Sequence, residues 1–347
     1  MKWIYFLMAI LATGAVFFVL FAGRSFNIKR SVATSYGELS IVTEPDDGIL
    51  PVLHMINGAS LSLDLVMYEL DDTQIEFALA ADERRGVAVR VILSGGYNGA
   101  TSTMNAVAYD FLIAHGVPVR YSPAYFSLTH EKSLVVDNAR ALIMTFNLVS
   151  KYYVTGRDFG IVDADRRDIA AMEDTFEDDW NGAAANDSGG ASMGGNNGDG
   201  GDDLLWSPGS EESLLGLING AKKSLYIYNE EMADADVTKA LIDAARRGIA
   251  VYVDMTGSSE WKWEFAELAT AGAHVRTYAD ADNASLYIHA KMVMADGTRA
   301  FVGSENFSAA SLGENRELGI MTSDRNVIAG LMKTFTADWQ GAVPFSP

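Results

Sequence analysis

Residues 287 to 308 read YIHAKMVMADGTRAFVGSENFS, and this stretch decides the fold because the chain contains a second version of it. The earlier version, THEKSLVVDNARALIMTFN at residues 129 to 147, lies 159 residues upstream of its match. In both versions a His is followed by a Lys two residues later and by an Asp five residues after the Lys. The chain has only 5 His in 347 residues, so two His in the same setting are hard to obtain by chance.

The similarity between the two halves extends beyond these stretches. INGASLSLDLVMYEL at residue 56 matches INGAKKSLYIYNEEM at residue 218, and RRGVAVRVIL at 84 matches RRGIAVYVDM at 246. Further along, RDFGIV at 157 matches RELGIM at 316, and FEDDW at 176 matches FTADW at 335. These matches occur in the same order with nearly constant offsets, which predicts an internal duplication of about 150 residues.

A run of Gly, Asn, Asp, Ser and Ala at residues 181–203 separates the two copies. It has almost no large apolar side chain to bury, so we expect a flexible linker between lobes at 37–180 and 204–347. In each copy, β-rich runs alternate with helical patterns, and one helix ends at Arg-Arg-Gly with Gly as its cap. The alternation predicts two α/β sandwich lobes with mostly parallel sheets.

The N-terminal segment differs from the rest of the chain. Residues 3–22 are uncharged and almost wholly apolar, which is long enough to span a bilayer. We expect residues 1–30 to form an uncleaved transmembrane anchor, with a signal peptide and a buried helix as the alternatives. An anchor of this kind predicts a membrane-bound protein whose body lies outside the cytoplasm, or a secreted protein if the segment is cleaved.

Composition limits the possible partners and chemistry. The net charge of −20 opposes nonspecific attraction to nucleic acid and to anionic lipid, although a local positive pocket remains compatible with it. The absence of cysteine excludes disulfides, cysteine–zinc sites and thiol catalysis.

The His-x-Lys elements suit chemistry on an oxyanion. Alternate residues of a strand share a face, so His130 and Lys132 point the same way, as do His289 and Lys291. A Lys supplies a fixed positive charge for a group such as phosphate, and a His can attack it or deliver a proton near neutral pH. A single His-x-Lys pair is usually an exposed polar pair, but its repetition favours function. Two further polar positions recur at matching distances, Asn147 with Asn306 and Asp158 with Glu317.

At these residues the sequence resembles the phospholipase D superfamily. Its signature is His-x-Lys-x4-Asp-x6-Gly-Ser-x-Asn, normally present twice. The second copy fits it completely with His289, Lys291, Asp296, Gly303, Ser304 and Asn306. The first copy keeps His130, Lys132, Asp137 and Asn147 but has Met144-Thr145 in place of Gly-Ser. The resemblance covers residues 37–347.

The resemblance implies that two lobes pack about a pseudo-twofold axis and bring both motifs into one cleft. His130 would attack phosphorus to give a covalent phosphohistidine, and His289 would protonate the leaving alcohol and then activate water or an acceptor alcohol. The other implied roles are phosphate binding by Lys132, Lys291, Asn147 and Asn306, orientation of the histidines by Asp158 and Glu317, hydrogen bonding to the substrate by Ser304 and Thr145, and a structural role for Asp137 and Asp296. No metal or other cofactor is expected, and a monomer is expected because one chain carries both motifs.

The motifs alone do not choose the substrate. The resemblance and the apolar N-terminus favour a membrane-anchored phosphodiesterase or phosphatidyltransferase that acts on phospholipid. The first alternative is an exported nuclease acting on DNA or RNA, against which the acidic charge argues. The second is a degenerate module that binds phosphate or lipid without catalysis, for which Met144-Thr145 is the main hint.

Overall fold

The computed structural model describes residues 39–97, 100–185, 203–279 and 285–346. The predicted anchor at 1–30 and most of the predicted linker lie outside these residues. Among the helices described, none is both long and apolar enough to cross a membrane. The last helix of the first half continues to Ala185, past the predicted start of the linker at residue 181.

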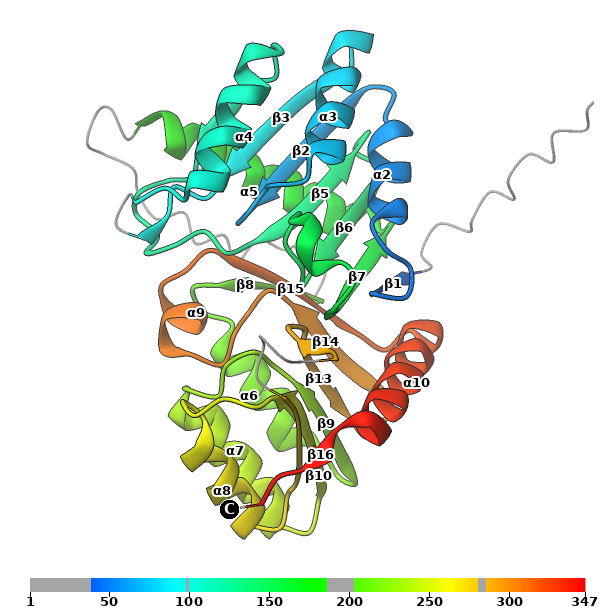
Figure 1. Ribbon diagram of the computed structural model, residues 1–347, viewed down its shortest axis with the longest axis vertical. Coiled ribbons are helices and arrows are strands. Elements are labelled where there is room, and N and C mark those ends of the chain that lie inside the picture. The colour runs from blue at the N-terminus through cyan, green and yellow to red at the C-terminus, as the bar shows by residue number, and fades with distance from the viewer. Residues whose placement is uncertain (1–38, 98–99, 186–202, 280–284, 347) are drawn as a thin grey trace, which may run out of the picture. The chain divides into compact units, whose positions relative to one another are not determined.

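The first half of the body, here called the first lobe, forms a sheet between two layers of helix (Figure 1). Its strand order is β1-β7-β6-β5-β2-β3-β4. The strands are β1 Ser40–Glu44, β2 Ser62–Met67, β3 Ala88–Leu93, β4 Val119–Tyr121, β5 Lys132–Val136, β6 Arg140–Met144 and β7 Gly156–Asp163. The apolar faces of α2 Leu50–Asn57, α3 Thr73–Arg85 and α4 Thr103–Ala114 pack on one side of the sheet, and α5 Arg166–Ala185 packs on the other. A short 3-10 helix at Ser150–Tyr152 precedes β7.

The second half, the second lobe, has the order β8-β15-β14-β13-β9-β10-β11-β16, which repeats that of the first lobe and adds β16 at the far edge. Its strands are β8 Leu204–Ser207, β9 Ser224–Tyr228, β10 Ala250–Thr256, β11 His274–Tyr278, β13 Lys291–Ala295, β14 Arg299–Gly303, β15 Glu317–Thr322 and β16 Val343–Pro344. The short strand β12, Tyr287–Ile288, joins the sheet of the first lobe beside β7. Its helices are α6 Glu211–Gly220, α7 Ala235–Arg246, α8 Lys262–Thr270, α9 Ala309–Gly313 and α10 Arg325–Gly341. The common order supports the predicted duplication.

The sheets are mixed, so the prediction of mostly parallel sheets was wrong. Strands β2-β3-β4 and β9-β10-β11 pair in parallel, joined by helices as the alternating pattern requires. The short strand β12 also pairs in parallel, with β7 of the other lobe. The other pairings within the two sheets are antiparallel, because the His-x-Lys strand and its successor form a hairpin in each lobe. The tight turns begin at Asp137 and Asp296, whose φ angles are 55° and 57°. Asp tolerates this left-handed conformation better than most residues with a side chain.

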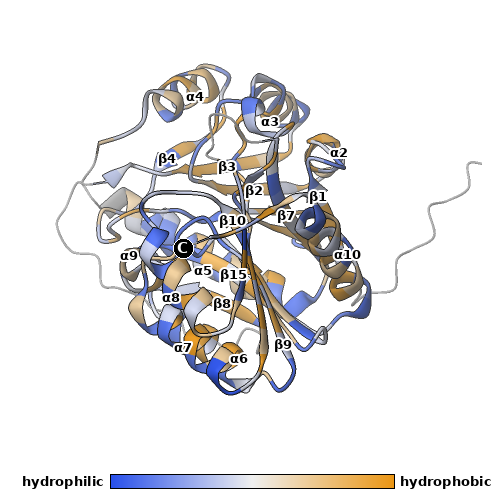
Figure 2. Ribbon diagram, turned by 60° about the horizontal axis from the view of Figure 1, so that its bottom comes forward, coloured by the Kyte–Doolittle hydropathy of each residue, from blue (hydrophilic) through white to orange (hydrophobic). Residues whose placement is uncertain are grey.

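The two lobes share part of their hydrophobic core, and this places both motifs at one interface. Strands β14 and β15 pack against β5 and β6. A single buried cluster draws on both lobes, including Ile143, Phe159, Ile161, Met292, Leu318 and Ile320. Figure 2 shows that the central strands are predominantly hydrophobic while the surrounding helices alternate hydrophobic and hydrophilic residues. Because protein interiors are closely packed, this shared core fixes how the two motifs face one another.

Candidate active site

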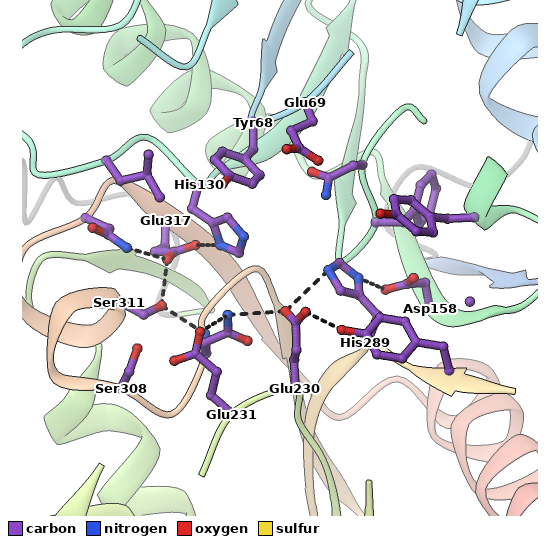
Figure 3. A pocket seen from close by; sticks show the side chains of 18 of the residues that line it. Tyr68, Glu69, His130, Asp158, Glu230, Glu231, His289, Ser308, Ser311 and Glu317 are labelled. Atoms are coloured by element: carbon purple, nitrogen blue, oxygen red, sulfur yellow. Dashed lines mark hydrogen bonds and ion pairs between the residues drawn. The ribbon is translucent and has the colours of Figure 1, made fainter. Parts of the chain in front are cut away.

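Both motif histidines line one cavity of about 520 Å³ between the lobes (Figure 3). Each precedes the first strand of its hairpin, His130 before β5 and His289 before β13. His130 is 7% exposed, and the side chain of His289 is 12% exposed. The structure therefore brings together the two residues that the sequence predicts as nucleophile and proton carrier.

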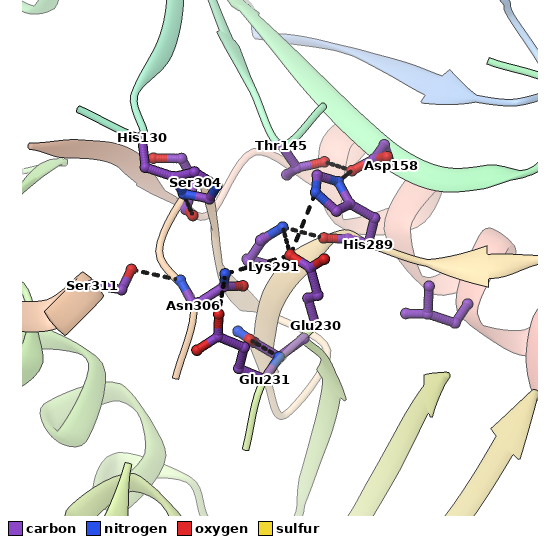
Figure 4. Close-up of polar contacts among 12 residues, drawn as sticks. His130, Thr145, Asp158, Glu230, Glu231, His289, Lys291, Ser304, Asn306 and Ser311 are labelled. Atoms are coloured by element: carbon purple, nitrogen blue, oxygen red, sulfur yellow. Dashed lines mark hydrogen bonds and ion pairs between the residues drawn. The ribbon is translucent and has the colours of Figure 1, made fainter. Parts of the chain in front are cut away.

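Each histidine ring contacts an acid of the opposite lobe. The Nδ1 atom of His130 lies 2.9 Å from Oε2 of Glu317, and Nδ1 of His289 lies 2.9 Å from Oδ1 of Asp158 (Figures 3 and 4). Both acids are buried at the starts of β15 and β7. These contacts suit the predicted orienting role, but the exchange between lobes was not predicted. A lobe on its own would have a histidine without its acid.

The main chain of each histidine is anchored by the residue that precedes the opposing acid. The N–H groups of His130 and Glu131 donate to the carbonyl oxygen of Arg316 at 2.8 and 3.0 Å. The N–H groups of His289 and Ala290 donate to the carbonyl oxygen of Arg157 at 3.2 and 2.8 Å. One dipeptide from each lobe therefore holds both the backbone and the ring of the histidine from the other lobe.

The arginines of these dipeptides form buried ion pairs between the lobes. Arg157 Nε lies 2.6 Å from Oδ2 of Asp338, and Arg316 Nε lies 2.8 Å from Oδ2 of Asp179. All four side chains are at most 7% exposed. This role was not predicted from the sequence, although both arginines and both aspartates lie in stretches that the duplication repeats, RDFGIV with RELGIM and FEDDW with FTADW.

The two motif lysines lie immediately behind the cavity wall and are fully buried. Lys132 Nζ donates to the carbonyl oxygen of His130 at 2.5 Å, and Lys291 Nζ donates to that of His289 at 2.7 Å. Burial, opposed in part by Glu317 and reinforced by Lys291, lowers the pKa of Lys132 to about 7. The ammonium groups thus lie next to the two motif histidines, where they can contribute positive charge to the cavity.

The amide side chains of the motifs reach the cavity, whereas the hydroxyl groups do not. Asn147 and Asn306 line it, and Asn306 Nδ2 donates to Glu231 Oε1 at 3.0 Å. Thr145 and Ser304 are fully buried in the wall. Thr145 Oγ1 donates to Asp158 Oδ1 at 2.5 Å, while Ser304 Oγ accepts from the Leu318 N–H at 3.1 Å. The sequence predicted substrate contacts for both hydroxyls, but the structure directs them to the strands that carry the two acids.

The first lobe has Met144-Thr145 where the second lobe has Gly303-Ser304, and the packing around each pair accounts for the difference. A Cβ atom at Gly303 would clash with the carboxylate of Glu305 and would lie 2.5 Å from the Cα of Gly319 across the strand pair. In the first lobe Phe146 stands where the second lobe has Glu305, and the buried Met144 faces Gly160. The altered motif therefore keeps its hairpin geometry.

Asp137 and Asp296 hold the loops before β2 and β9. The carboxylate of Asp137 accepts from the backbone N–H groups of residues 60, 61 and 62 at 2.6–3.0 Å. That of Asp296 accepts from the N–H groups of residues 222, 223 and 224 at 2.6–3.1 Å. Burial acts to raise the pKa of each carboxyl group, but these donors outweigh it and lower both pKa values. The two aspartates are absent from the cavity lining.

Glu230, two residues after the end of β9, is a cavity residue that was not predicted from the sequence. Its Oε2 lies 3.1 Å from Lys291 Nζ, 3.4 Å from His289 Nε2 and 3.4 Å from Asn306 Nδ2 (Figure 4). The Tyr287 hydroxyl donates to Oε1 at 2.6 Å. Burial acts to raise the pKa of Glu230, but Lys291 and His289 outweigh it and hold this pKa well below its usual range. The matching residue of the first lobe is Tyr68, so a search for repeated residues could not find Glu230.

The electrostatics distinguish the two histidines. Burial, opposed in part by Glu317 and reinforced by Lys132, lowers the pKa of His130 to about 4. A neutral His130 that donates Nδ1–H to Glu317 leaves a free lone pair on Nε2, which is the form needed for attack. The ring of His289 lies between two carboxylates, with Asp158 at Nδ1 and Glu230 at Nε2. A protonated ring can donate to both, which suits a proton donor.

Comparison with known proteins gives a consistent family match. Residues 52–180 and 214–339 each match the family model described as the PLD-like domain of cardiolipin synthase. A cardiolipin synthase of Listeria welshimeri is 25% identical over 236 residues, which cover 60% of this chain and 47% of that protein. A phospholipase D of Rickettsia conorii is 28% identical over 131 residues, which cover 38% of this chain and 62% of that protein. The chain spans about half the length of the Listeria relative.

Among solved structures, the phosphatidylserine synthase of Haemophilus influenzae superposes with a TM-score of 0.67. The alignment covers 88% of this chain and 87% of that one at 12% identity. At this level of identity the likeness supports the fold alone.

Proposed function

The chain belongs to the family of PLD-like domains that cardiolipin synthases contain, and on this basis we propose that it is a phosphodiesterase that cleaves or transfers a phosphatidyl group. The observation that carries the proposal is the pair of histidines in one cavity, each with its Nδ1 atom 2.9 Å from an acid of the other lobe. Two such histidines can supply a nucleophile and a proton donor to opposite sides of one phosphorus atom.

In the first step, Nε2 of His130 attacks phosphorus and a P–N bond forms. The bond between phosphorus and the leaving alcohol oxygen breaks, and His289 gives its Nε2 proton to that oxygen. In the second step, His289 takes a proton from water or from an acceptor alcohol, whose oxygen attacks phosphorus. The P–N bond then breaks, which restores His130 and releases a phosphomonoester or a new phosphodiester.

The surrounding residues supply charge and orientation to both steps. Glu317 and Asp158 hold the two rings and offset the positive charge that each ring carries in turn. Lys132, Lys291 and the two motif asparagines stabilise negative charge on the phosphate oxygens. Since the histidines and lysines perform these roles, we expect turnover to be independent of added metal and to survive EDTA.

The charge of the cavity favours a phospholipid over a polynucleotide. Among the described residues that line it, six are Asp or Glu and none is Lys or Arg. A polynucleotide carries repeated phosphates and normally requires several basic contacts. We therefore keep the nuclease as the alternative function and the non-catalytic module as the third.

We also propose that residues 3–22 anchor the protein to a membrane, with its catalytic body outside the cytoplasm as a monomer. The apolar length of the segment and the presence of both motifs in one chain support this arrangement. Protease treatment of intact cells should then remove the body from a membrane fraction, and protection of the body would argue for the opposite orientation.

The test compares substrates on the full-length protein in detergent. Phosphatidylcholine, phosphatidylglycerol and single-stranded DNA are assayed side by side, with bis(p-nitrophenyl) phosphate as a generic diester. We expect turnover of lipid and of the generic diester, lost in both His130→Ala and His289→Ala. DNA cleavage with inert lipids would establish the nuclease instead, and binding of phosphate without any turnover would establish the non-catalytic module.

A further inference from the structure

Glu230 places a carboxylate among the groups that would bind phosphate. Within 3.4 Å its Oε2 atom meets Lys291 Nζ, His289 Nε2 and Asn306 Nδ2. These are a cation, the proposed proton donor and an amide donor, which is the set that an oxyanion requires. The single Nε2–H of His289 cannot be donated to a phosphate and to Glu230 at the same time, so the two anions compete for it.

The carboxylate is held firmly in this position. The Tyr287 hydroxyl donates to its other oxygen at 2.6 Å, and Tyr287 belongs to β12, which pairs with β7 of the first lobe. Glu231, the next residue, contacts the same Asn306 amide at 3.0 Å but has no ion pair among the described residues. Lys291 and His289 together stabilise the ionised form of Glu230, so the competing group carries a full negative charge at neutral pH.

The first lobe has no equivalent of this group. Tyr68 occupies the matching position, and its ring meets the ring of His130 edge-on at 4.6 Å. Tyr68 therefore gives His130 a neutral neighbour in addition to Glu317, whereas Glu230 gives His289 an ionised acid in addition to Asp158. Because only the second lobe has an acid at this position, we expect its role to concern only the His289 side of the site.

We propose that Glu230 is an internal anion that competes for the phosphate site and selects singly charged phosphodiesters over doubly charged phosphomonoesters. The inference rests on the proposed phosphodiesterase function. At a given geometry the repulsion between Glu230 and a bound phosphate grows in proportion to the phosphate charge. A diester carries one negative charge, whereas a monoester carries about two above its second pKa of about 6.

The selection has a direct use in hydrolysis. When water is the acceptor, the product left between the histidines is a phosphomonoester. A site built only of Lys, His and Asn donors would bind this dianion more tightly than the substrate, and the product would accumulate there. As Glu230 returns to Lys291 and Asn306, it displaces the dianion and limits inhibition by product and by inorganic phosphate.

The test measures binding of two anions of similar size to the full-length protein by calorimetry at pH 7.5. Dimethyl phosphate represents the diester and methyl phosphate the monoester. For Glu230→Gln we expect the Kd of methyl phosphate to fall about tenfold or more and that of dimethyl phosphate to fall less than about threefold. Glu230→Asp, which keeps the charge, should retain the wild-type ratio of the two Kd values. Glu267→Gln, an exposed exchange on α8, is the control and should also retain it.

An unchanged ratio in Glu230→Gln, or weaker binding of both anions, would overturn the proposal by showing that Glu230 only positions Lys291. A lack of binding of either anion to any variant would overturn it as well, because the site would then not be a phosphate site. Turnover is scored separately with bis(p-nitrophenyl) phosphate. If Glu230→Gln changes the ratio of the two Kd values but the wild-type protein shows no turnover, the phosphodiesterase function is rejected and the proposal for Glu230 stands. If the protein turns over the diester but the ratio does not change, the proposal for Glu230 is rejected and the phosphodiesterase function stands.

Discussion

His130 and Glu317 belong to different halves of a duplicated chain, yet Nδ1 of the histidine lies 2.9 Å from Oε2 of the acid. The reciprocal contact between His289 and Asp158 has the same length. Each half thus supplies one histidine and the acid that orients the other half's histidine. Under the proposed mechanism, this exchange requires both copies in a fixed relation.

Glu317→Gln should lower kcat by roughly 10²- to 10⁴-fold while leaving the fold intact. A glutamine can present its amide N–H to Nδ1 of His130, and the ring proton then moves to Nε2, where it blocks the attacking lone pair. Turnover of bis(p-nitrophenyl) phosphate measures the effect, and Glu212→Gln, an exposed exchange on α6, is the control. Near-normal kcat in Glu317→Gln would show that this acid does not set the form of the ring.

The buried pair of Arg157 and Asp338 should show strong coupling in stability. Arg157→Met leaves the Asp338 carboxylate buried with a Tyr228 hydroxyl as its remaining side-chain donor, and we expect a loss of about 3–5 kcal/mol in the free energy of unfolding. The double variant Arg157→Met/Asp338→Leu removes both charges and should lose less than the sum of the single losses. Urea unfolding of the four proteins measures the coupling, and additive losses would contradict a direct interaction between the two residues.

The pH dependence of kcat/KM should follow two buried groups of the first motif. His130 must be unprotonated to attack, and its pKa is lowered to about 4, so activity should rise as pH increases through this value. Lys132 must be protonated to stabilise the phosphate, and its pKa is lowered to about 7, so activity should fall as pH increases through that value. The expected profile is a plateau between these two values, measured with bis(p-nitrophenyl) phosphate, whose charge is constant there.

A profile that still rises above pH 8 would show that the charge of Lys132 is not required. The rise of kcat/KM at low pH provides an internal check. A midpoint of this rise near the ordinary His pKa of about 6.5 would place His130 in a more solvated setting than the one described.

The repeated residues explain how much of the site the sequence could predict. His130, His289, Asn147 and Asn306 recur at a constant spacing, and all four line the cavity. The family match bears out the resemblance on which their implied roles rest. Repetition reveals residues whose chemistry both halves retain, so it led directly to the cavity.

Other features depend on contacts that no single stretch encodes. The exchange of acids between lobes and the Arg–Asp pairs arise only when the two halves pack together. Glu230 has no repeated partner, because Tyr68 stands in the other half. The sheets were predicted to be mostly parallel because helices separate the first strands of each lobe. The sequence of a strand does not show whether it pairs in parallel or antiparallel with its neighbour. The hairpins at Asp137 and Asp296 reverse that direction.

The most direct test of the account is to trap the covalent intermediate. Full-length His289→Asn is incubated with bis(p-nitrophenyl) phosphate, whose nitrophenolate leaves without a proton donor, while hydrolysis of the intermediate lacks its base. Peptide mass spectrometry at alkaline pH, where phosphohistidine persists, should find a nitrophenylphosphoryl group on His130. His130→Asn/His289→Asn should show none. An adduct on another residue, or continued turnover by His289→Asn without any adduct, would contradict the account.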